Sequence, residues 1–558
     1  MKDKYIKLMG KALSAYSDEH IIRYFNDVKK EGLKEHGFAR LTANMGILIS
    51  HGIRQDLTPL FIEMMTFCCQ TIPKVDAAND FTVREIVCCI RETQKSGKFD
   101  KELIEKWKSD LSTINPLTCY TVYAKSVDDP VKNWALYTAV SEFFRQREGL
   151  CQSQDFIETQ IGSQIKWLDE NGLYMDNEGD VHHPILYDIV ARGLFALLLN
   201  EGYRGRYYHT IDDCLRRSAL VTLKMQSPNG EIAFGGRSNQ FLHNEPWLIA
   251  TYEYEAKRYA LEGDYEKAKE FKSAIKRALD VTERFLGLTP IRHIKNRFPT
   301  QTKYGCEDYA YFDKYMITTA SFLYNSYIIC DDTIATEEKE DDKPTIFTTS
   351  YHFHKTFAKA GGYGLEFDVN ADGKYDASGL GRVHKAKAPS TICLSSPCAP
   401  NPSYTIPQDM VGSLSLCAGA KRKGGWIFAD DSQTQYRLIS HATDQESAYL
   451  TFENHFSCGE KVVCDYAINA KGVSVKVKGD GKVCYVLPAF SFDGYARTEI
   501  TQGENSLEIN YDGWICRYTT DGLIQDIGQT FGNRNGYYKK FLAVAEKEIN
   551  IKIEILKR

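Results

Sequence analysis

The hydrophobic repeat of this 558-residue chain changes once, near residue 330, and that change restricts the fold more than any other feature. Before it, apolar residues recur at the three-and-four spacing of amphipathic helices, for example over 186–199 and 265–286. After it the repeat becomes two, since Val473, Val475 and Val477 alternate with polar residues. The pattern predicts an α+β multidomain protein whose N-terminal part is helical and whose C-terminal part is antiparallel β-structure.

The size of the helical part predicts its architecture. About 330 residues exceed what one simple bundle core can bury, so we expect a closed ring of antiparallel helix pairs, an (α/α) toroid, over residues 1–330. The acidic, proline-containing stretch 331–345 is expected to be a linker. Asp-Gly pairs then recur at hairpin-like intervals, and residues 346–558 are predicted to form an antiparallel β-sandwich.

Composition excludes several classes of protein. The chain has 69 Lys and Arg against 74 Asp and Glu, a net charge of -5, which argues against a nucleic-acid partner. It has no long uncharged apolar run, so no membrane partner is expected. Its 16 cysteines include no Cys-x-x-Cys, which predicts buried free thiols and a cytoplasmic protein without a cofactor. The sequence leaves homo-oligomerisation open.

Polar residues gather in four clusters, each just before a predicted helix and about one helical hairpin after the last. Helices that run in the same direction in a toroid begin at one mouth, so these clusters are expected to converge there, where unpaired N–H groups favour anions. Simpler alternatives remain: Asn133, Asn244 and Asp308 as N-caps, tyrosines in the core, and a histidine pair in a surface turn. The clusters contain Asn133 and Trp134; His182, His183, Tyr187 and Asp188; Arg237, Ser238, Asn239, Gln240, His243, Asn244, Glu245 and Trp247; and Glu307, Asp308, Tyr309, Tyr311 and Asp313.

The third cluster carries a resemblance. Asn229-Gly230 followed by 234–238, Phe-Gly-Gly-Arg-Ser, resembles the Asp-Gly…Phe-Gly-Arg-Ser segment of a bacterial (α/α)-toroid family that includes β-glucuronidases, with one extra glycine here. Asn133-Trp134 and 171–174 are also similar to segments of heparinase- and alginate-lyase-type enzymes, which share the toroid-plus-sandwich layout. The resemblance implies a carbohydrate-active enzyme with an anionic oligosaccharide substrate that contains uronic acid.

Two chemistries follow. A glycosidase needs two carboxylates across the bond, and Asp188 with Glu307 or Asp308 are the candidates, while Arg237 and Asn239 hold the uronate. A lyase needs groups that neutralise the uronate carboxylate, a base for the C5 proton and an acid for the leaving oxygen. For the lyase, the neutralising groups are Arg237, Asn239, Gln240 and Asn133; His243 is the candidate base, and Tyr187 or Tyr309 the acid. We favour hydrolysis by a glucuronidase-like exo-glycosidase, with elimination second and a non-catalytic glycan-binding protein third.

The remaining candidates are binding residues. Ser238 and Asn244 belong to the polar cluster, and Trp134 and Trp247 are candidates for stacking on sugar rings. In the sandwich, Arg382 and His384 follow a tight glycine loop and are expected to reach the cleft. His352 and His354 alternate, so a strand would put both on one face at a spacing that a metal could use, although two ordinary histidines are the preferred interpretation.

Overall fold

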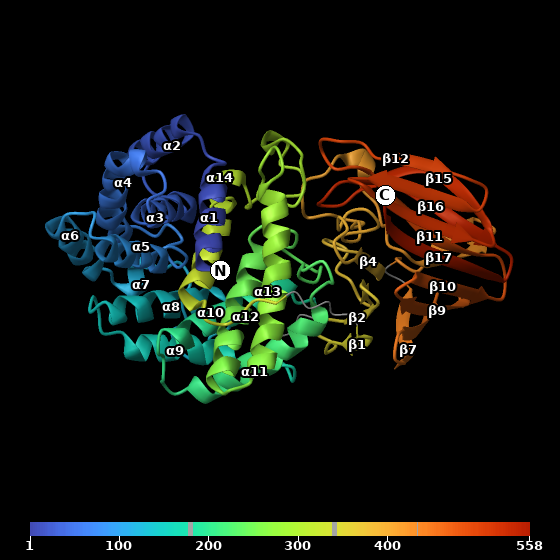
Figure 1. Ribbon diagram of the computed structural model, residues 1–558, viewed down its shortest axis with the longest axis horizontal. Helices are drawn as coiled ribbons and strands as arrows, with labels where there is room; N and C mark the ends of the chain where they lie inside the picture. Colours follow the sequence, from blue (N-terminus) through green and yellow to red (C-terminus); the bar gives the residue numbers. More distant parts are fainter. Residues whose placement is uncertain (177–181, 338–342, 432–433) are drawn as a thin grey trace.

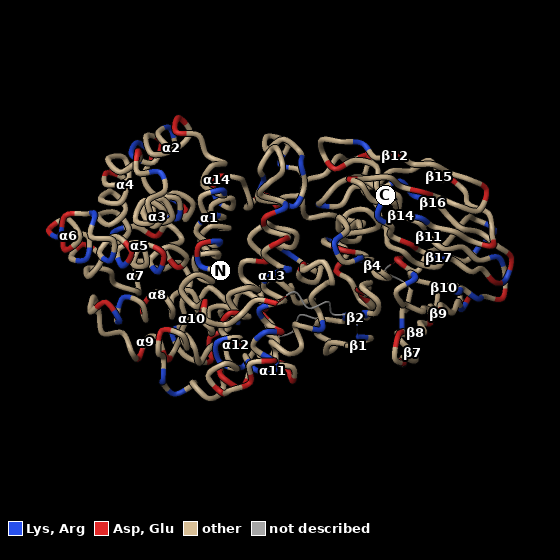
Figure 2. Tube along the Cα trace, viewed as in Figure 1, with Lys and Arg blue, Asp and Glu red and all other residues tan. Residues whose placement is uncertain are grey.

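The computed structural model describes residues 1–176, 182–337, 343–431 and 434–558. A helical domain and a β-domain lie next to each other along the long axis of the molecule (Figure 1). Basic and acidic residues are interspersed over both domains (Figure 2). Over the described ranges, no helix has the length and apolarity needed to cross a membrane.

The helical domain is a closed ring, as the sequence predicts. Within the described residues, six helices form its inner layer: each packs against the next, and the last returns to the first. These are α3 (His36–Ser50), α5 (Val83–Ser96), α8 (Trp134–Arg147), α10 (Ile185–Asn200), α12 (Asn244–Leu261) and α15 (Thr318–Ile329). The other long helices are α1 (Lys2–Leu13), α2 (Asp18–Glu31), α4 (Thr58–Thr71), α6 (Lys101–Ser112), α9 (Gln154–Ile165), α11 (Tyr208–Met225) and α13 (Tyr265–Leu286).

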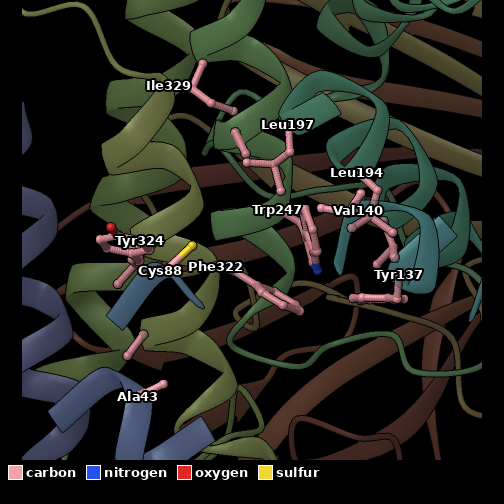
Figure 3. Close-up of a cluster of buried hydrophobic side chains, with 14 of the residues drawn as sticks. Ala43, Cys88, Tyr137, Val140, Leu194, Leu197, Trp247, Phe322, Tyr324 and Ile329 are labelled. Carbon is pink, nitrogen blue, oxygen red and sulfur yellow. The ribbon is translucent and has the colours of Figure 1, made fainter. Parts of the chain in front are cut away.

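Side chains fill the middle of the ring. Residues from all six inner helices converge there (Figure 3), and the Trp247 ring lies 4.3 Å from that of Phe322. Gly193 allows the close approach of α10 and α12, since a Cβ at this position would lie 2.3 Å from the Trp247 ring. Trp247 is therefore fully buried in the core, where it cannot stack on a sugar as the sequence suggested.

The β-domain contains three antiparallel sheets within the described residues, one more than a plain two-sheet sandwich. The strands of the four-stranded sheet, which lies next to the ring, are β1 (Thr345–Thr348), β2 (Lys355–Ala360), β3 (Tyr363–Asp368) and β4 (Gly379–Lys385). An eight-stranded sheet contains β7 (Gln435–Thr443), β8 (Ala448–His455), β9 (Lys461–Asn469), β10 (Gly472–Gly479), β12 (Glu499–Gln502), β13 (Ser506–Tyr511), β14 (Trp514–Thr520) and β17 (Glu548–Lys557). The five-stranded sheet contains β5 (Ala418–Arg422), β6 (Gly425–Phe428), β11 (Val483–Phe492), β15 (Leu523–Gly532) and β16 (Tyr537–Ala545).

Alternation in the sequence marks the face of the sandwich core. β10 pairs with β17, and Val473, Val475 and Val477 lie opposite Ile553, Ile551 and Ile549, all of them buried. Burying such pairs between the larger sheets is the main stabilisation of a sandwich. Of the 16 cysteines, 14 are buried and all are free, so the prediction of buried thiols is confirmed for these 14; Cys151 is half-buried and Cys458 exposed.

Two boundaries differ from expectation. The stretch 309–329, whose apolar residues also recur at the spacing that predicts a helix, is not one helix: it starts as a loop and continues as α14 (Phe312–Tyr315) and α15. The Ala310 carbonyl hydrogen-bonds to the His293 ring at 2.7 Å. Because it does not accept from a backbone amide one turn later, as it would in a helix, this segment stays a loop. Of the predicted linker, 338–342 lie outside the described residues, and β1 already begins at Thr345.

Candidate functional site

The clusters before α10, α12 and α14 meet through Tyr187, Ser238 and Tyr309, whereas Asn133, before α8, is bonded to Asp176. Three clusters precede α8, α10 and α12, which are consecutive in the inner ring, and the fourth precedes α14. The loop before α12 crosses the start of α10, where the Ile185 amide donates to the Gly235 carbonyl at 3.3 Å. Gly235 and Gly236 have positive φ, and a Cβ on Gly236 would lie 2.9 Å from Pro184 Cα. The glycine pair therefore lets this loop pass over α10 and present the residues that follow.

Three hydroxyls form a chain at the mouth, which we call the hydroxyl chain: Tyr187, Ser238 and Tyr309. Ser238 Oγ lies 3.3 Å from Tyr187 Oη and hydrogen-bonds to Tyr309 Oη. Ser238 adopts a left-handed φ of 64°, a conformation that costs energy in a non-glycine residue and often marks a functional position. The exposed Arg237 guanidinium lies over the Tyr309 ring, 4.5 Å from its centre.

The charges around the hydroxyl chain set its protonation. Burial raises the pKa of Tyr187, and the positive charge of Arg237 opposes that shift. Burial and the nearby Glu307 carboxylate raise the pKa of Tyr309 well above its usual value. Both phenols are therefore protonated at neutral pH in the free protein, and the ionised form of Tyr309 is a minor species that grows as the pH rises.

Arg534, a residue of the β-domain, fixes the position of the hydroxyl chain through Glu307. Arg534 binds the Glu307 carboxylate with both nitrogens, at 2.8 and 2.7 Å, and the Ser238 amide donates to the same carboxylate at 2.7 Å. All three residues are buried, and the Arg534 guanidinium also lies over the Tyr404 ring, 4.3 Å from its centre. This bidentate pair holds Ser238, and with it both phenols, in one geometry.

A second carboxylate contacts the other end of the same loop. Asp376 accepts a hydrogen bond from the Gly236 amide at 2.7 Å. Burial raises the pKa of Asp376 to about 6, although Lys355 and this hydrogen bond oppose the shift. Asp376 is thus the carboxyl group beside the mouth that can hold a proton near neutral pH.

Asn133 is bonded inside the protein. Its Nδ2 donates to Asp176 Oδ1 at 2.7 Å and its amide donates to the same oxygen at 3.0 Å, so it occupies the N-cap position of α8 without a capping hydrogen bond from its side chain. Trp134 is half-buried with its ring 4.6 Å from Phe81. Both side chains lie at the start of α8, and these contacts join them to other residues of the protein, Asp176 and Phe81.

Other predicted residues do not line the mouth together. Asp188 is fully buried, and its carboxylate binds Arg192 at 2.8 and 2.5 Å and the Tyr174 amide at 2.8 Å. Asp308 is exposed to solvent. Since one carboxylate points inward and the other outward, the expected pair across a glycosidic bond is not formed by Asp188 and Asp308.

His243 lies within the helical domain, stacked on Phe241 at 5.2 Å, and burial lowers its pKa well below the usual value. Asn244 Nδ2 donates to the Ser238 carbonyl at 3.4 Å and supports the loop from inside. Asn239 and Gln240 are buried and bonded to each other at 2.6 Å.

The sandwich candidates are also internal. Arg382 is fully buried and donates to the Ser395 carbonyl at 2.8 Å and to Glu366 at 2.7 Å. His384 is buried 4.0 Å from Glu231, and burial lowers its pKa to about 3. These side chains join the β-domain to the loop before α12 instead of facing a substrate.

The histidine pair is not on a strand, contrary to expectation. His352 and His354 lie in the turn before β2, and His354 has a left-handed φ of 46°. His354 Nδ1 lies 2.5 Å from Asp368, and the two rings face His183 and His182 at 5.6 and 5.4 Å. Within the described ranges no group of three His, Cys, Asp or Glu residues is arranged to hold a metal.

Sequence reasoning missed Arg534 and did not select Asp376. Both had a signal: Arg534 is the centre of a Gly-Asn-Arg-Asn-Gly run at 532–536, and Asp376 precedes the glycine loop from which Arg382 was chosen. Polar residues between glycines, in the turn between two strands, are typical of side chains presented at a site.

Comparison with known proteins gives no family. No family model matches the chain, and no curated protein matches it. Among solved structures, Streptomyces coelicolor A3 chondroitin AC lyase in complex with chondroitin sulphate is 10% identical, covering 99% of this chain and 79% of that one at a TM-score of 0.48. A mutant heparan sulfate lyase of Pedobacter heparinus is 10% identical, with 94% and 76% covered and a TM-score of 0.44. A glycosyl hydrolase family 88 protein of Bacteroides vulgatus is 10% identical, with 59% and 99% covered and a TM-score of 0.36.

Proposed function

We propose that this protein is an enzyme that cleaves uronic-acid-containing oligosaccharides by β-elimination at the mouth of the ring. The observation that carries the proposal is the hydroxyl chain beside an exposed guanidinium: two phenols joined through Ser238, with Arg237 over one of them. Elimination needs a cation at the uronate carboxylate, a base for the C5 proton and an acid for the leaving oxygen. Arg237, Tyr309 and Tyr187 supply these three functions in one place.

The reaction proceeds as follows. Arg237 binds the uronate carboxylate and stabilises the negative charge that develops as the C5–H bond breaks. In the ionised fraction of the protein, whose Tyr309 has lost its proton to solvent, the phenolate takes the C5 proton. The C4–O bond breaks, and the electron pair of the C5–H bond forms the C4=C5 double bond. Tyr187 protonates the leaving oxygen. Tyr309 is then neutral and Tyr187 ionised, and Ser238 Oγ, which lies between them, returns the proton and restores the site.

Glu307 and Arg534 position these groups without reacting. The Glu307 carboxylate holds the Ser238 amide, and Arg534 neutralises its charge, so a sugar carboxylate meets less repulsion at the mouth. The bonds from Arg534 and from the Ser238 amide occupy both carboxylate oxygens of Glu307, so neither oxygen is left to contact a substrate.

Hydrolysis is the second candidate, and one observation favours it. Asp376 has a pKa raised to about 6 by burial and contacts the loop that carries Arg237, so it could protonate a leaving oxygen. A second buried carboxylate at the mouth, Glu307, has its oxygens occupied by Arg534 and Ser238. Elimination does not need a second carboxylate at the mouth, and we therefore rank it first.

The test is incubation of the protein with size-defined oligosaccharides of chondroitin, heparan, alginate and polygalacturonate. We expect one of them to give products with the ultraviolet absorbance of a C4=C5 unsaturated uronate. Cleavage without that absorbance would replace elimination with hydrolysis, and binding without cleavage of any substrate would identify a glycan-binding protein.

A further inference from the structure

A hollow lies between the two domains, away from the hydroxyl chain. It is a groove of about 980 Å³, with α13 and the loop after α11 on one side and four β-domain segments on the other. In Figure 1, α13 stands at the edge of the ring next to β2 and β4. The groove shares no lining residue with the hydroxyl chain, Arg237, Glu307, Asp376 or Arg534, so it is a separate site.

The groove is strongly basic in a protein of net charge -5. Its lining contains seven lysine or arginine residues and two carboxylates, Asp280 and Glu446. Of the basic residues, α13 provides Lys276, Arg277 and Arg284, and the β-domain provides Lys385, Lys387 and Lys471. Lys276 pairs with Asp280 and Arg284 with the buried Glu231, both at 3.1 Å. The seven basic residues still outnumber these two carboxylates and Glu446, so the groove has a positive potential that attracts an anion spanning it.

Close contacts fix both walls. A Cβ on Gly361 would lie 2.1 Å from the Ala470 amide, so the turn after β2 sits directly against the turn after β9. A Cβ on Gly364 would lie 2.4 Å from Pro228, so the loop after α11 sits on β3. At the base of the groove, the buried Lys359 donates to the Leu223 carbonyl at 2.8 Å. Rigid walls bind a ligand without first having to be ordered.

The side chains favour a glycan over a nucleic acid. Asn229, Gln445 and Asn469 add amides that can bond to hydroxyls, and the lining contains no aromatic residue. Single-stranded nucleic acids are bound by basic grooves that also provide aromatic platforms for the bases. The volume is also at the upper end of the range for small-ligand pockets, which fits several sugar units better than one small anion.

We propose that this groove is a second, non-catalytic binding site for an anionic oligosaccharide, sulfated or uronate-rich. The choice of a glycan as the occupant rests on the proposed function, whereas the preference for a polyanion rests on the groove alone. The groove holds one part of a long chain while another part occupies the mouth, which raises the effective concentration of cleavable bonds.

The experiment is a titration with a chondroitin sulfate hexasaccharide, in a Tyr309→Phe background so that the probe is not cut. The groove variant is Lys276→Gln/Lys387→Gln/Lys471→Gln. Its matched control is Lys30→Gln/Lys101→Gln/Lys106→Gln, three exposed lysines on α2 and α6 at the far side of the ring from the β-domain (Figure 1). We expect two sites per chain in the background and in the control. We expect the groove variant to lose one of them, with affinity there reduced roughly tenfold or more, since three of the cations that line the groove are removed.

The outcomes separate the two proposals. Unchanged stoichiometry and affinity in the groove variant overturn the second site. A single-stranded DNA oligomer that competes for the groove as tightly as the hexasaccharide overturns the glycan as its occupant. If instead Arg237→Ala removes no site while the groove variant does, the groove stands and the proposed function at the mouth fails.

Discussion

Replacing Tyr309 with phenylalanine tests the proposed chemistry most directly. The substitution removes one oxygen and keeps the ring over which the Arg237 guanidinium lies at 4.5 Å. That stacking is worth about 0.5–1 kcal/mol and is retained, so substrate binding and KM should change by no more than roughly twofold. The lost hydrogen bond to Ser238 should cost about 0.5–1.5 kcal/mol of folding stability, which leaves the protein folded.

The effect on kcat should be much larger. A positioned acid–base group contributes about 10²–10⁴-fold, or about 2.7–5.4 kcal/mol of barrier, so kcat should fall by that factor. The assay is the initial rate of unsaturated uronate formation on the best oligosaccharide of the panel. Tyr436→Phe makes the same chemical change in the β-domain core, where the ring packs on Phe452 at 4.7 Å, and should leave kcat unchanged. A Tyr309→Phe enzyme that keeps more than about a tenth of the wild-type kcat would refute the assignment of Tyr309 as the base.

Three further predictions concern the pH dependence of activity, the ion pair between Arg534 and Glu307, and the buried ion pair between Asp188 and Arg192. Because burial raises the pKa of Tyr309 and its phenolate is the reactive form, kcat/KM should rise with pH from neutral to alkaline; a fall above pH of about 6, where Asp376 loses its proton, would instead indicate hydrolysis. Arg534→Lys keeps the charge but cannot make both bonds to the Glu307 carboxylate, so kcat should fall at least about tenfold with the far-ultraviolet spectrum unchanged, and an unaltered kcat would argue against a positioning role. Asp188→Asn leaves Arg192 buried without its carboxylate partner, so thermal unfolding should show a loss of about 3–5 kcal/mol in stability; an unchanged melting temperature combined with lost activity would return Asp188 to the catalytic site.

The sequence predicted the architecture because periodicity reports directly on burial. The alternating valines and isoleucines of β10 and β17 lie opposite each other in the sandwich, and the segment 265–286 is α13 to the residue. Hairpin spacing predicted that four polar clusters share one mouth, because the direction of successive helices in a ring is fixed by topology. The structure joins three of them, through Tyr187, Ser238 and Tyr309.

Site prediction was less complete, because a one-dimensional pattern does not show which way a side chain points. Asp188 and Tyr187 are neighbours at the start of α10, yet the first faces Arg192 inside and the second faces Ser238 at the mouth. Trp247 and Arg382 have the chemistry expected of binding residues and are buried in structural contacts. Arg534 lies 227 residues after its partner Glu307, and no local signal connects the two.

That separation along the chain has a consequence for biosynthesis. The arginine that holds Glu307 is translated only after the whole ring and most of the β-domain have left the ribosome. A nascent or truncated chain that lacks it carries a buried carboxylate with no counter-ion, which works against the ordered arrangement of Ser238. The arrangement that the proposed elimination needs therefore forms only after translation has passed residue 534, and fragments that end before that residue are expected to lack cleavage activity.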